Sequence, residues 1–483
     1  MTSIRPTRLR YDDRLALSAI VSVLLTIWSA RTTASGAPQA TEDCFVIEVV
    51  DEQTGRGVPL VELETVNYLR YVTDSNGIVA LREPGLMNQS VFFTITSHGY
   101  EFPADMFGFH GKALDVKPGQ NVKLSIKRTK NIAERLYRVT GEGIYADSVI
   151  AGRKTPIAQP MLNAQVVGSD SVQSAVYRGK VYWFWGDTNR PSYPLGSFDT
   201  TGATSDLPGH GDGLDPLIGV NLHYFTDSKT GFVRGMVPRA KDEKGPIWLD
   251  GLFTVKDDSG RERLLAQASR YKDLGTRLER NLVVFDDDQQ QFAKLKPIPL
   301  DAPLAPFGQS FHASVDGQDY VYFCSPYPNI RVKADWKHVT DLSSYESRKP
   351  TEASPHELKD AGSGKELHLH ISSVSWNEFR KKWIMIGEEG RGTSNLGEVW
   401  YAEAPSPEGP WEQAVKIVTH DKYSFYNPAQ HDFFAQSGGR YVFFEGTFAN
   451  TFAGTDKSTP RYEYNQIMYR LDLADPRLAP AQR

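Results

Sequence analysis

A pair of short strands, of which the second is rich in aromatic residues, recurs five times in this 483-residue chain. The copies occupy residues 168–188, 248–270, 309–324, 367–389 and 426–447. Their polar heads lie near residues 170, 250, 310, 370 and 427, so the spacing is about 60 to 80 residues. One pair of strands cannot bury its apolar face alone, so the copies are expected to pack against one another.

Further strands follow most copies of the repeat. We expect third strands at 219–227, 281–285, 397–402 and 464–472, and a fourth strand at 414–418. Four antiparallel strands repeated five times around an axis make a five-bladed β-propeller, which we predict for residues 140–478. An aromatic share of 11%, with 40 Gly and 29 Pro to form turns, is typical of an all-β chain.

Residues 44–128 contain shorter alternating strands, at 44–50, 59–64, 91–96 and 122–127. They predict a small β-sandwich ahead of the propeller. This segment resembles the transthyretin-like, or carboxypeptidase regulatory-like, domain of secreted enzymes. The matching residues are Val50, Asp51, Thr54, Gly55, Val58, Pro59, Thr73, Asp74, Gly77, Gly99 and Tyr100. The resemblance implies a supporting or binding role rather than catalysis.

The first 36 residues have the pattern of a secretory signal peptide. Several arginines precede an apolar run of 14 residues at 15–28, which is short for a membrane span, and small residues follow at 34–37. We therefore predict a secreted or periplasmic protein with no membrane span after signal removal. A retained membrane anchor is the alternative.

The formal net charge of −5 argues against a nucleic-acid partner, which would require a basic face. The two cysteines, Cys44 and Cys324, are too few for a disulfide scaffold or a zinc site made of cysteines. Export would permit a disulfide between them, but two small buried hydrophobic residues are the favoured interpretation. No cofactor or metal site is predicted, with a central structural calcium ion as the alternative, and the oligomeric state stays open.

In a propeller, the heads of the inner strands converge at one mouth of a central channel. The heads of the five copies carry Asp170, Asp250, His312, His370 and His431. The ends of the second strands carry Asp187, Arg270, Glu388, Glu389 and Glu445. Glycoside hydrolysis needs one carboxylic acid to protonate the leaving oxygen and one carboxylate to activate water or attack carbon. The aromatic residues Trp185, Trp248 and Tyr426 near the same mouth suit stacking on sugar rings.

The segment 170–184 resembles the first-blade motif of the arabinanase and β-xylosidase type of five-bladed glycoside hydrolases. Asp170 matches their catalytic base, with Ser171 in place of a proline. Asp250 matches their second acidic residue, which tunes the acid and orients the sugar. The third copy begins at Gln309 and has no Glu for their general acid.

The segments 184–188 (FWGDT) and 426–431 (YNPAQH) are also similar to the bacterial endo-D-arabinanase family. That resemblance implies that acidic residues around Gly186, Asp187 and Thr188 are catalytic. It also brings Asn427 and His431 into the candidate site.

We therefore predict a secreted glycoside hydrolase acting on a poly- or oligosaccharide. The predicted catalytic residues are Asp170, Asp187, Asp250 and Glu389. The base is Asp170 or Asp187, Asp250 is the modulator, and the acid is Glu388, Glu389 or Glu445, of which Glu389 is selected. The predicted substrate-binding residues are Arg270, His312, His431, Trp185 and Asn427.

Two other functions are compatible with this sequence. A propeller binds as readily as it catalyses, so a non-catalytic carbohydrate- or ligand-binding protein is one alternative. A polysaccharide lyase that uses His431 and Tyr426 is the other. The sugar, the linkage, and endo or exo action are not determined by the sequence.

Overall fold

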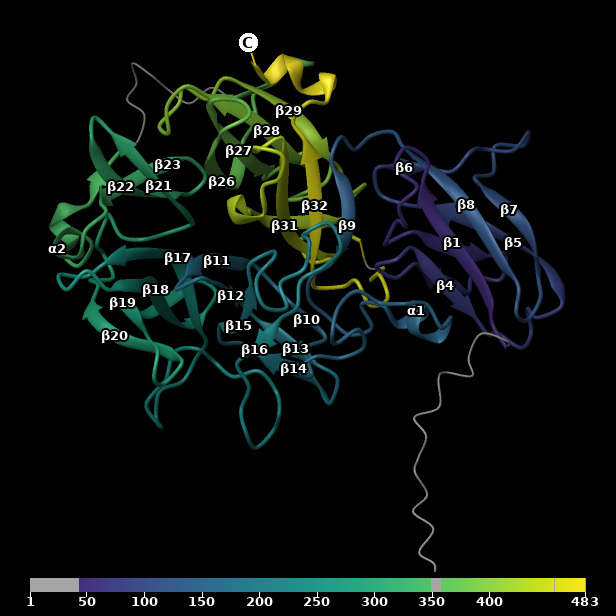
Figure 1. Ribbon diagram of the computed structural model, residues 1–483, viewed down its shortest axis with the longest axis horizontal. Coiled ribbons are helices and arrows are strands. Elements are labelled where there is room, and N and C mark those ends of the chain that lie inside the picture. The colour runs from purple at the N-terminus through teal and green to yellow at the C-terminus, as the bar shows by residue number, and fades with distance from the viewer. Residues whose placement is uncertain (1–42, 349–357, 456, 483) are drawn as a thin grey trace, which may run out of the picture. The chain divides into compact units, whose positions relative to one another are not determined.

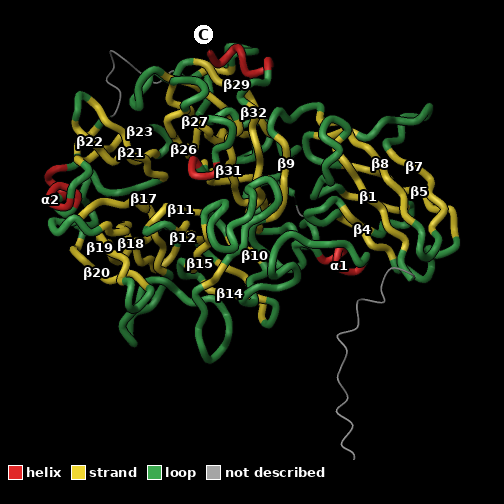
Figure 2. Tube along the Cα trace, viewed as in Figure 1, coloured by secondary structure: helices red, strands yellow, loops and turns green. Residues whose placement is uncertain are grey.

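The computed structural model describes residues 43–348, 358–455 and 457–482, and residues 40–483 form one compact unit. The predicted signal peptide, residues 1–36, lies outside the described residues. Strands dominate the chain trace, and helices are few and short (Figure 2). Within these ranges, no helix is both long and apolar enough to cross a membrane.

The first eight strands form two four-stranded sheets. One sheet has the order β4-β1-β8-β6, with β4 at Ile78–Leu81, β1 at Phe45–Asp51, β8 at Asn121–Arg128 and β6 at Tyr100–Glu101. The other has the order β3-β2-β5-β7, with β3 at Arg70–Val72, β2 at Glu62–Thr65, β5 at Gln89–Thr96 and β7 at Gly111–Val116. Alternate residues of both sheets, such as Ile47, Leu63 and Phe93, are buried in one shared core, which makes this segment a β-sandwich.

Six further sheets follow among the described residues, and five of them are blades. Blade 1 has the order β11 (Val172–Tyr177), β12 (Lys180–Trp185), β15 (Thr201–Asp206) and β16 (His223–Tyr224). Blade 2 has the order β17 (Ile247–Lys256), β18 (Glu262–Asp273), β19 (Thr276–Asp286) and β20 (Gln291–Pro297). Blade 3 has the order β21 (Gln309–Val315), β22 (Gln318–Cys324), β23 (Pro328–Lys333) and β24 (Glu346–Ser347).

Blade 4 has the order β26 (Leu369–Asn377), β27 (Lys382–Glu389), β28 (Val399–Ala404) and β29 (Gln413–Val418), with β25 (Lys359–Asp360) parallel to β29. Blade 5 has the order β30 (Ser424–Gln430), β31 (Tyr441–Ala449), β32 (Asn465–Asp472) and β9 (Glu134–Arg138). A small sheet of β10 (Gly168–Ser169), β13 (Thr188–Arg190) and β14 (Tyr193–Ser197) adjoins blade 1. The helical segments are α1 (Ala146–Ile150), α2 (Trp336–Val339), η1 (Leu342–Ser344), η2 (Asp432–Phe434) and η3 (Pro476–Gln482).

The five inner strands close into a ring, which confirms the predicted propeller. Each of β11, β17, β21, β26 and β30 contacts the next, and β30 contacts β11. A central pocket of about 540 Å³ is lined by residues from all five inner strands. An apolar cluster fills the space between each pair of successive blades, so face-to-face burial of the aromatic strands holds the ring together.

Blade 5 combines strands from both ends of the propeller sequence. Its outermost strand, β9, precedes the first blade in the chain and pairs antiparallel with β32 near the C-terminus. Figure 1 shows blue β9 beside yellow β32. Arg135 of β9 is buried, and its Nε donates to the carbonyl oxygen of Pro59 in the sandwich at 3.0 Å. The strand that closes the ring therefore also joins it to the sandwich.

The structure differs from the sequence prediction at the third strand of blade 1, and it shows the environment of the two cysteines. The predicted third strand at 219–227 is wrong, because the polar segment Thr201–Asp206 is the third strand of blade 1 and only His223–Tyr224 pairs beyond it. The polar side chains of this strand gave no apolar signal in the sequence. Cys44 and Cys324 are both buried, and no disulfide joins them.

If β9 closes the ring, a cavity in this strand should destabilise the whole propeller. Leu136 has no exposed surface and packs between blades 5 and 1. Leu136→Ala is expected to lower the free energy of unfolding by about 2–5 kcal/mol, because it leaves a cavity in the closing strand. Urea unfolding followed by tryptophan fluorescence measures this. Leu300, which is 53% exposed, gives the matched control Leu300→Ala, and equal losses in the two variants would contradict the role given to β9.

Candidate active site

The amino ends of the inner strands gather at one mouth, because all five blades run in the same direction around the axis. Asp170 and Ser171 precede β11, Asp250 lies near the start of β17, and Asn427 lies near the start of β30. Asp187 follows β12, which pairs with β11 so that Trp185 lies opposite Val172. The geometry thus brings together carboxyl groups that are far apart in the sequence.

Asp170 is held by two tyrosine hydroxyl groups. Its Oδ2 accepts a hydrogen bond of 2.7 Å from the Tyr464 hydroxyl and one of 3.4 Å from the Tyr426 hydroxyl. Burial raises its pKa to about 6, although these hydrogen bonds act in the opposite direction. A Cβ on Gly186 would lie 2.0 Å from Asp170 Oδ1, so only glycine allows this carboxyl to lie against the strand end.

Asp187 is the second carboxyl of the pair. Its backbone carbonyl accepts from the Asp170 amide at 3.1 Å, and its Oδ1 accepts from Trp248 Nε1 at 2.9 Å. Burial and the negative charge of Asp170 raise its pKa to about 7. Both side chains are only half-buried, so they remain within reach of solvent. Two neighbouring carboxyl groups at the mouth, Asp170 and Asp187, therefore both have raised pKa values.

An indole ring lies beside this pair. Trp248 is half-buried and packs against the ring of Tyr271, with 4.9 Å between centroids. The hydrogen bond from Trp248 Nε1 to Asp187 fixes the orientation of the indole ring. A partly exposed indole ring next to two carboxyl groups is suited to packing against the apolar face of a sugar ring.

Asp250 is fixed by backbone amides. Its Oδ1 accepts from Gly308 N at 2.7 Å and from Gly251 N at 2.8 Å. Gly308 has a φ of +82°, and a Cβ there would lie 1.7 Å from the Cys324 carbonyl oxygen, so the turn requires glycine. Burial raises the pKa of Asp250 to about 6. Asp250 also accepts a 3.5 Å bond from Gln173 of β11, which ties blade 2 to blade 1.

Glu388 is a buried acid beneath the mouth. Its side chain has no exposed surface, and its Oε2 accepts from Asn427 N at 2.9 Å. Its Oε1 accepts no hydrogen bond from the described residues and lies 3.9 Å from His370 Nε2. Burial raises the pKa of Glu388 well above its ordinary value, which favours the protonated form of this carboxyl.

Two residues at the mouth have left-handed backbone conformations. Ser171 has a φ of 45° and Asn427 a φ of 54°, and Asn427 Nδ2 donates to Ser171 Oγ at 2.6 Å. Non-glycine residues in this region carry strain that the surrounding structure must offset. The pair links Glu388 on one side to Asp170 on the other. Asn427 thus lies in the wall of the site, where its side-chain Nδ2 already donates to Ser171.

Glu389 points to the other face of β27. Its Oε1 lies 3.2 Å from Lys365 Nζ, and its Oε2 accepts from Trp400 Nε1 at 3.1 Å. It is 4% exposed and belongs to the packing between β27 and β28. The structure therefore does not bring the predicted acid to the carboxyl pair.

Three of the predicted substrate-binding residues lie away from the carboxyl pair or are buried. Trp185 is 1% exposed and stacks on Trp183, so its rings serve the core between blades. His431 has no exposed surface and lies 3.6 Å from Glu445 Oε1, beyond the opposite end of β30. His312 is exposed but lines the central pocket rather than the mouth.

Arg270 ends near the mouth but turns outward. Its Nε lies 3.2 Å from Glu279 Oε2 on β19, and its Nη1 donates to the Lys244 carbonyl oxygen at 3.0 Å. The Glu279 contact directs the guanidinium toward β19, and the Lys244 contact holds it to the loop that precedes β17.

Sequence reasoning missed Tyr464, which makes the shortest hydrogen bond to Asp170. Tyr464 precedes β32 and belongs to no repeated position, so the period of the blades gave no signal for it. Across residues 43–348, 358–455 and 457–482, no group of three or more His, Cys, Asp or Glu side chains is placed to hold a metal ion.

No family model matches this sequence, and no curated protein matches it. Solved structures that align with this chain include an exo-β-1,3-galactanase from Phanerochaete chrysosporium, at TM-score 0.39 and 9% identity, covering 64% of this chain and 61% of that chain. An α-L-arabinanase from Penicillium chrysogenum has TM-score 0.34 and 11% identity, covering 71% and 99%. A GH43_1 enzyme from Xanthomonas citri has TM-score 0.36 and 11% identity, covering 64% and 88%.

The match therefore spans about three fifths of the galactanase chain. Because every one of these TM-scores is below 0.5, the blade assignment rests on the sheets and the ring of inner strands described above.

Burial of Glu388 should make the free energy of unfolding depend on pH. Its pKa in the folded protein is raised above the ordinary value of 4.5, so the folded state keeps a proton that the unfolded state releases. Stability is therefore lost as the pH rises above about 4.5, by at most about 1.4 kcal/mol per pH unit. Glu388→Gln removes this loss.

The measurement is urea unfolding of the wild type and Glu388→Gln between pH 5 and 8. The variant should gain stability relative to the wild type with each step in pH. A constant difference across this range would show that Glu388 is ionised in the folded protein.

Proposed function

We propose that this protein is a glycoside hydrolase whose catalytic groups are Asp170 and Asp187. The observation that carries the proposal is the coupled pair itself, two half-buried carboxyls with pKa values of about 6 and 7 beside the indole of Trp248. Such a pair supplies one protonated and one ionised carboxyl near neutral pH, which is what cleavage of a glycosidic bond requires.

Asp187 serves as the general acid. It has the higher pKa, because burial and the charge of Asp170 both favour its protonated form. It protonates the leaving glycosidic oxygen. Glu388 and Glu389 are 0% and 4% exposed, so neither touches a substrate at the mouth. This assignment replaces Glu389, which was predicted from the sequence.

Asp170 serves as the ionised carboxylate that attacks the anomeric carbon or activates water. The Tyr464 hydroxyl donates to it and stabilises its charged form. Asp250 is fixed by two backbone amides and lies two residues from Trp248 on the same face of β17, where it positions the substrate. These positions support a sugar ring held against Trp248.

The substrate class is a polysaccharide or oligosaccharide. The first test incubates the wild type with arabinan, xylan and β-1,3-galactan, and with aryl glycosides of arabinose, xylose and galactose, and measures released reducing sugar. Asp187→Asn and Asp170→Asn are each expected to lower the rate by about 10²–10⁴-fold, because each removes a proton-transfer or charge-stabilising group.

Glu389→Gln is the discriminating comparison, because Glu389 follows Glu388 on the same strand but pairs with Lys365. Its rate should fall less than about ten-fold. A large loss in Glu389→Gln with full activity in Asp187→Asn would move the acid to Glu389.

The pH dependence of kcat/KM should be a narrow bell with its maximum between pH 6 and 7. The acidic limb reports the first ionisation of the pair, near pH 6. The basic limb reports the loss of the second proton, near pH 7. Tyr464→Phe removes a hydrogen bond to the charged form of Asp170. The acidic limb should therefore move to higher pH, by about one unit.

Tyr462→Phe is the matched control. Its hydroxyl donates to the Thr73 carbonyl oxygen at 2.7 Å, away from the carboxyl pair. The control should leave both limbs in place, and an unmoved acidic limb in Tyr464→Phe would exclude Asp170 as the group that ionises there.

A further inference from the structure

A groove of about 910 Å³ lies between the sandwich and the mouth end of the propeller. One wall comes from the sheet of β2, β3 and β5, including Glu62, Arg70 and Thr96. The other wall comes from three loops that follow β27, precede β30 and follow β31, including Thr393, Tyr423 and Lys457. Its volume lies in the range of roughly 300–1,000 Å³ that is common for ligand sites.

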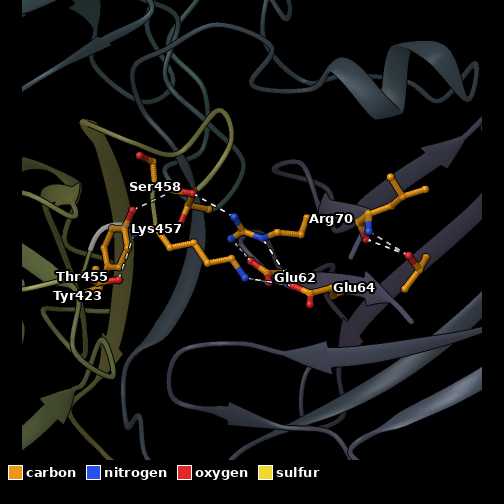
Figure 3. Close-up of polar contacts among 10 residues, drawn as sticks. Glu62, Glu64, Arg70, Tyr423, Thr455, Lys457 and Ser458 are labelled. Atoms are coloured by element: carbon orange, nitrogen blue, oxygen red, sulfur yellow. Dashed lines mark hydrogen bonds and ion pairs between the residues drawn. The ribbon is translucent and has the colours of Figure 1, made fainter. Parts of the chain in front are cut away.

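Ion pairs across the groove hold its two walls together (Figure 3). Lys457 Nζ lies 3.1 Å from Glu64 Oε2 and 3.5 Å from Glu62 Oε1. Arg70 pairs with Glu62, and its Nη1 donates to the Ser458 carbonyl oxygen at 3.3 Å. The two negative and two positive charges balance. This part of the groove therefore presents hydrogen-bond donors and acceptors without a net charge.

The groove and the carboxyl pair share the same loops. Asn395 Nδ2 donates to the Phe452 carbonyl oxygen at 2.9 Å, which joins the loop after β27 to the loop after β31. Phe452 is 57% exposed, and its ring lies 5.6 Å from that of Tyr426, whose hydroxyl contacts Asp170. The loop that contains Phe452 ends at Tyr464, whose hydroxyl also donates to Asp170.

We propose that this groove binds the sugar units of a neutral polysaccharide that extend beyond the bond to be cleaved, so that the sandwich is part of the substrate-binding surface. The proposal rests on the proposed glycosidase function. Neutral sugars fit because the four charged side chains that bridge the walls, Glu62, Glu64, Arg70 and Lys457, are already paired with one another. The exposed residues Thr96 and Thr393 add hydroxyl groups to the two opposite walls. Sugar hydroxyls can form hydrogen bonds with these ion-paired side chains, and because they are neutral they leave the charge balance of the groove unchanged.

The test is affinity electrophoresis in native gels that contain arabinan, xylan or β-1,3-galactan. It uses the Asp187→Asn variant, so that the polysaccharide is not digested during the run. Thr96→Trp and Thr393→Trp are added separately to this variant and fill the groove from opposite walls. Ser90→Trp is the matched control, since Ser90 is exposed on the same face of β5 but lies outside the groove.

Retardation by at least one polysaccharide is expected. Each groove variant should raise the apparent Kd for it at least ten-fold, and Ser90→Trp should leave it unchanged. Thermal unfolding checks that each variant folds, and the use of two walls keeps the test valid where one variant is unstable.

Unchanged retardation in both groove variants overturns the proposal, as does the absence of retardation in all three gels. Failure of the proposed function is a separate result, since it is seen as undiminished hydrolysis by Asp187→Asn or as no hydrolysis by the wild type. Polysaccharide binding that is lost in Thr96→Trp without hydrolysis by the wild type would support the groove and reject the catalytic assignment.

Discussion

The pairing of β9 with β32 is the interaction on which the rest of the structure depends. Each blade buries its faces against its two neighbours, so the ring is stable only when the last blade meets the first. Backbone hydrogen bonds between strands from opposite ends of the propeller sequence meet this need in blade 5. Because the ring is closed, the amino ends of the five inner strands are fixed around one axis, and the side chains at the mouth are held in place.

The same closed ring allows the protein to bury carboxyl groups that would otherwise be hydrated. Asp170, Asp187, Asp250 and Glu388 all have raised pKa values, and burial is the largest cause in each. Each ionised form costs stability, which the apolar clusters between the blades offset. A site of this kind is stable only on a rigid scaffold, because relaxation of the strands would let water reach the acids and return their pKa values to normal.

The fold could be predicted largely from the sequence. The five strand pairs were visible because their second strands, such as 180–185 and 441–445, are continuous apolar and aromatic runs. The third strand of blade 1 was missed, because Thr201–Asp206 is polar and packs through backbone pairing with β12. The closing strand Glu134–Arg138 gave no repeat signal, since it has no partner strands beside it in the sequence.

The site was predictable only in part. Asp170, Asp187 and Asp250 were expected at one mouth because strand ends in equivalent blades meet there, and the structure places all three at the amino ends of the inner strands. Glu389 and Trp185 were expected to face the substrate, but both are buried in the structure. Both lie in strands that are buried on both faces, so alternation along the strand does not show which face turns toward the mouth. Tyr464 lies outside the repeat, and only its contact with Asp170 reveals it.

The sequence by itself determined the five-fold repeat and the placement of carboxyl groups at the ends of its strands, because hydrophobic period and chain direction are local properties. Only the tertiary structure decided which carboxyls lie together at the mouth, which are fully buried, and which residues of the sandwich line a groove beside the mouth. Those outcomes depend on desolvation and on distances between residues hundreds of positions apart, such as Asp170 and Tyr464. Neither quantity is encoded in any short segment of the chain.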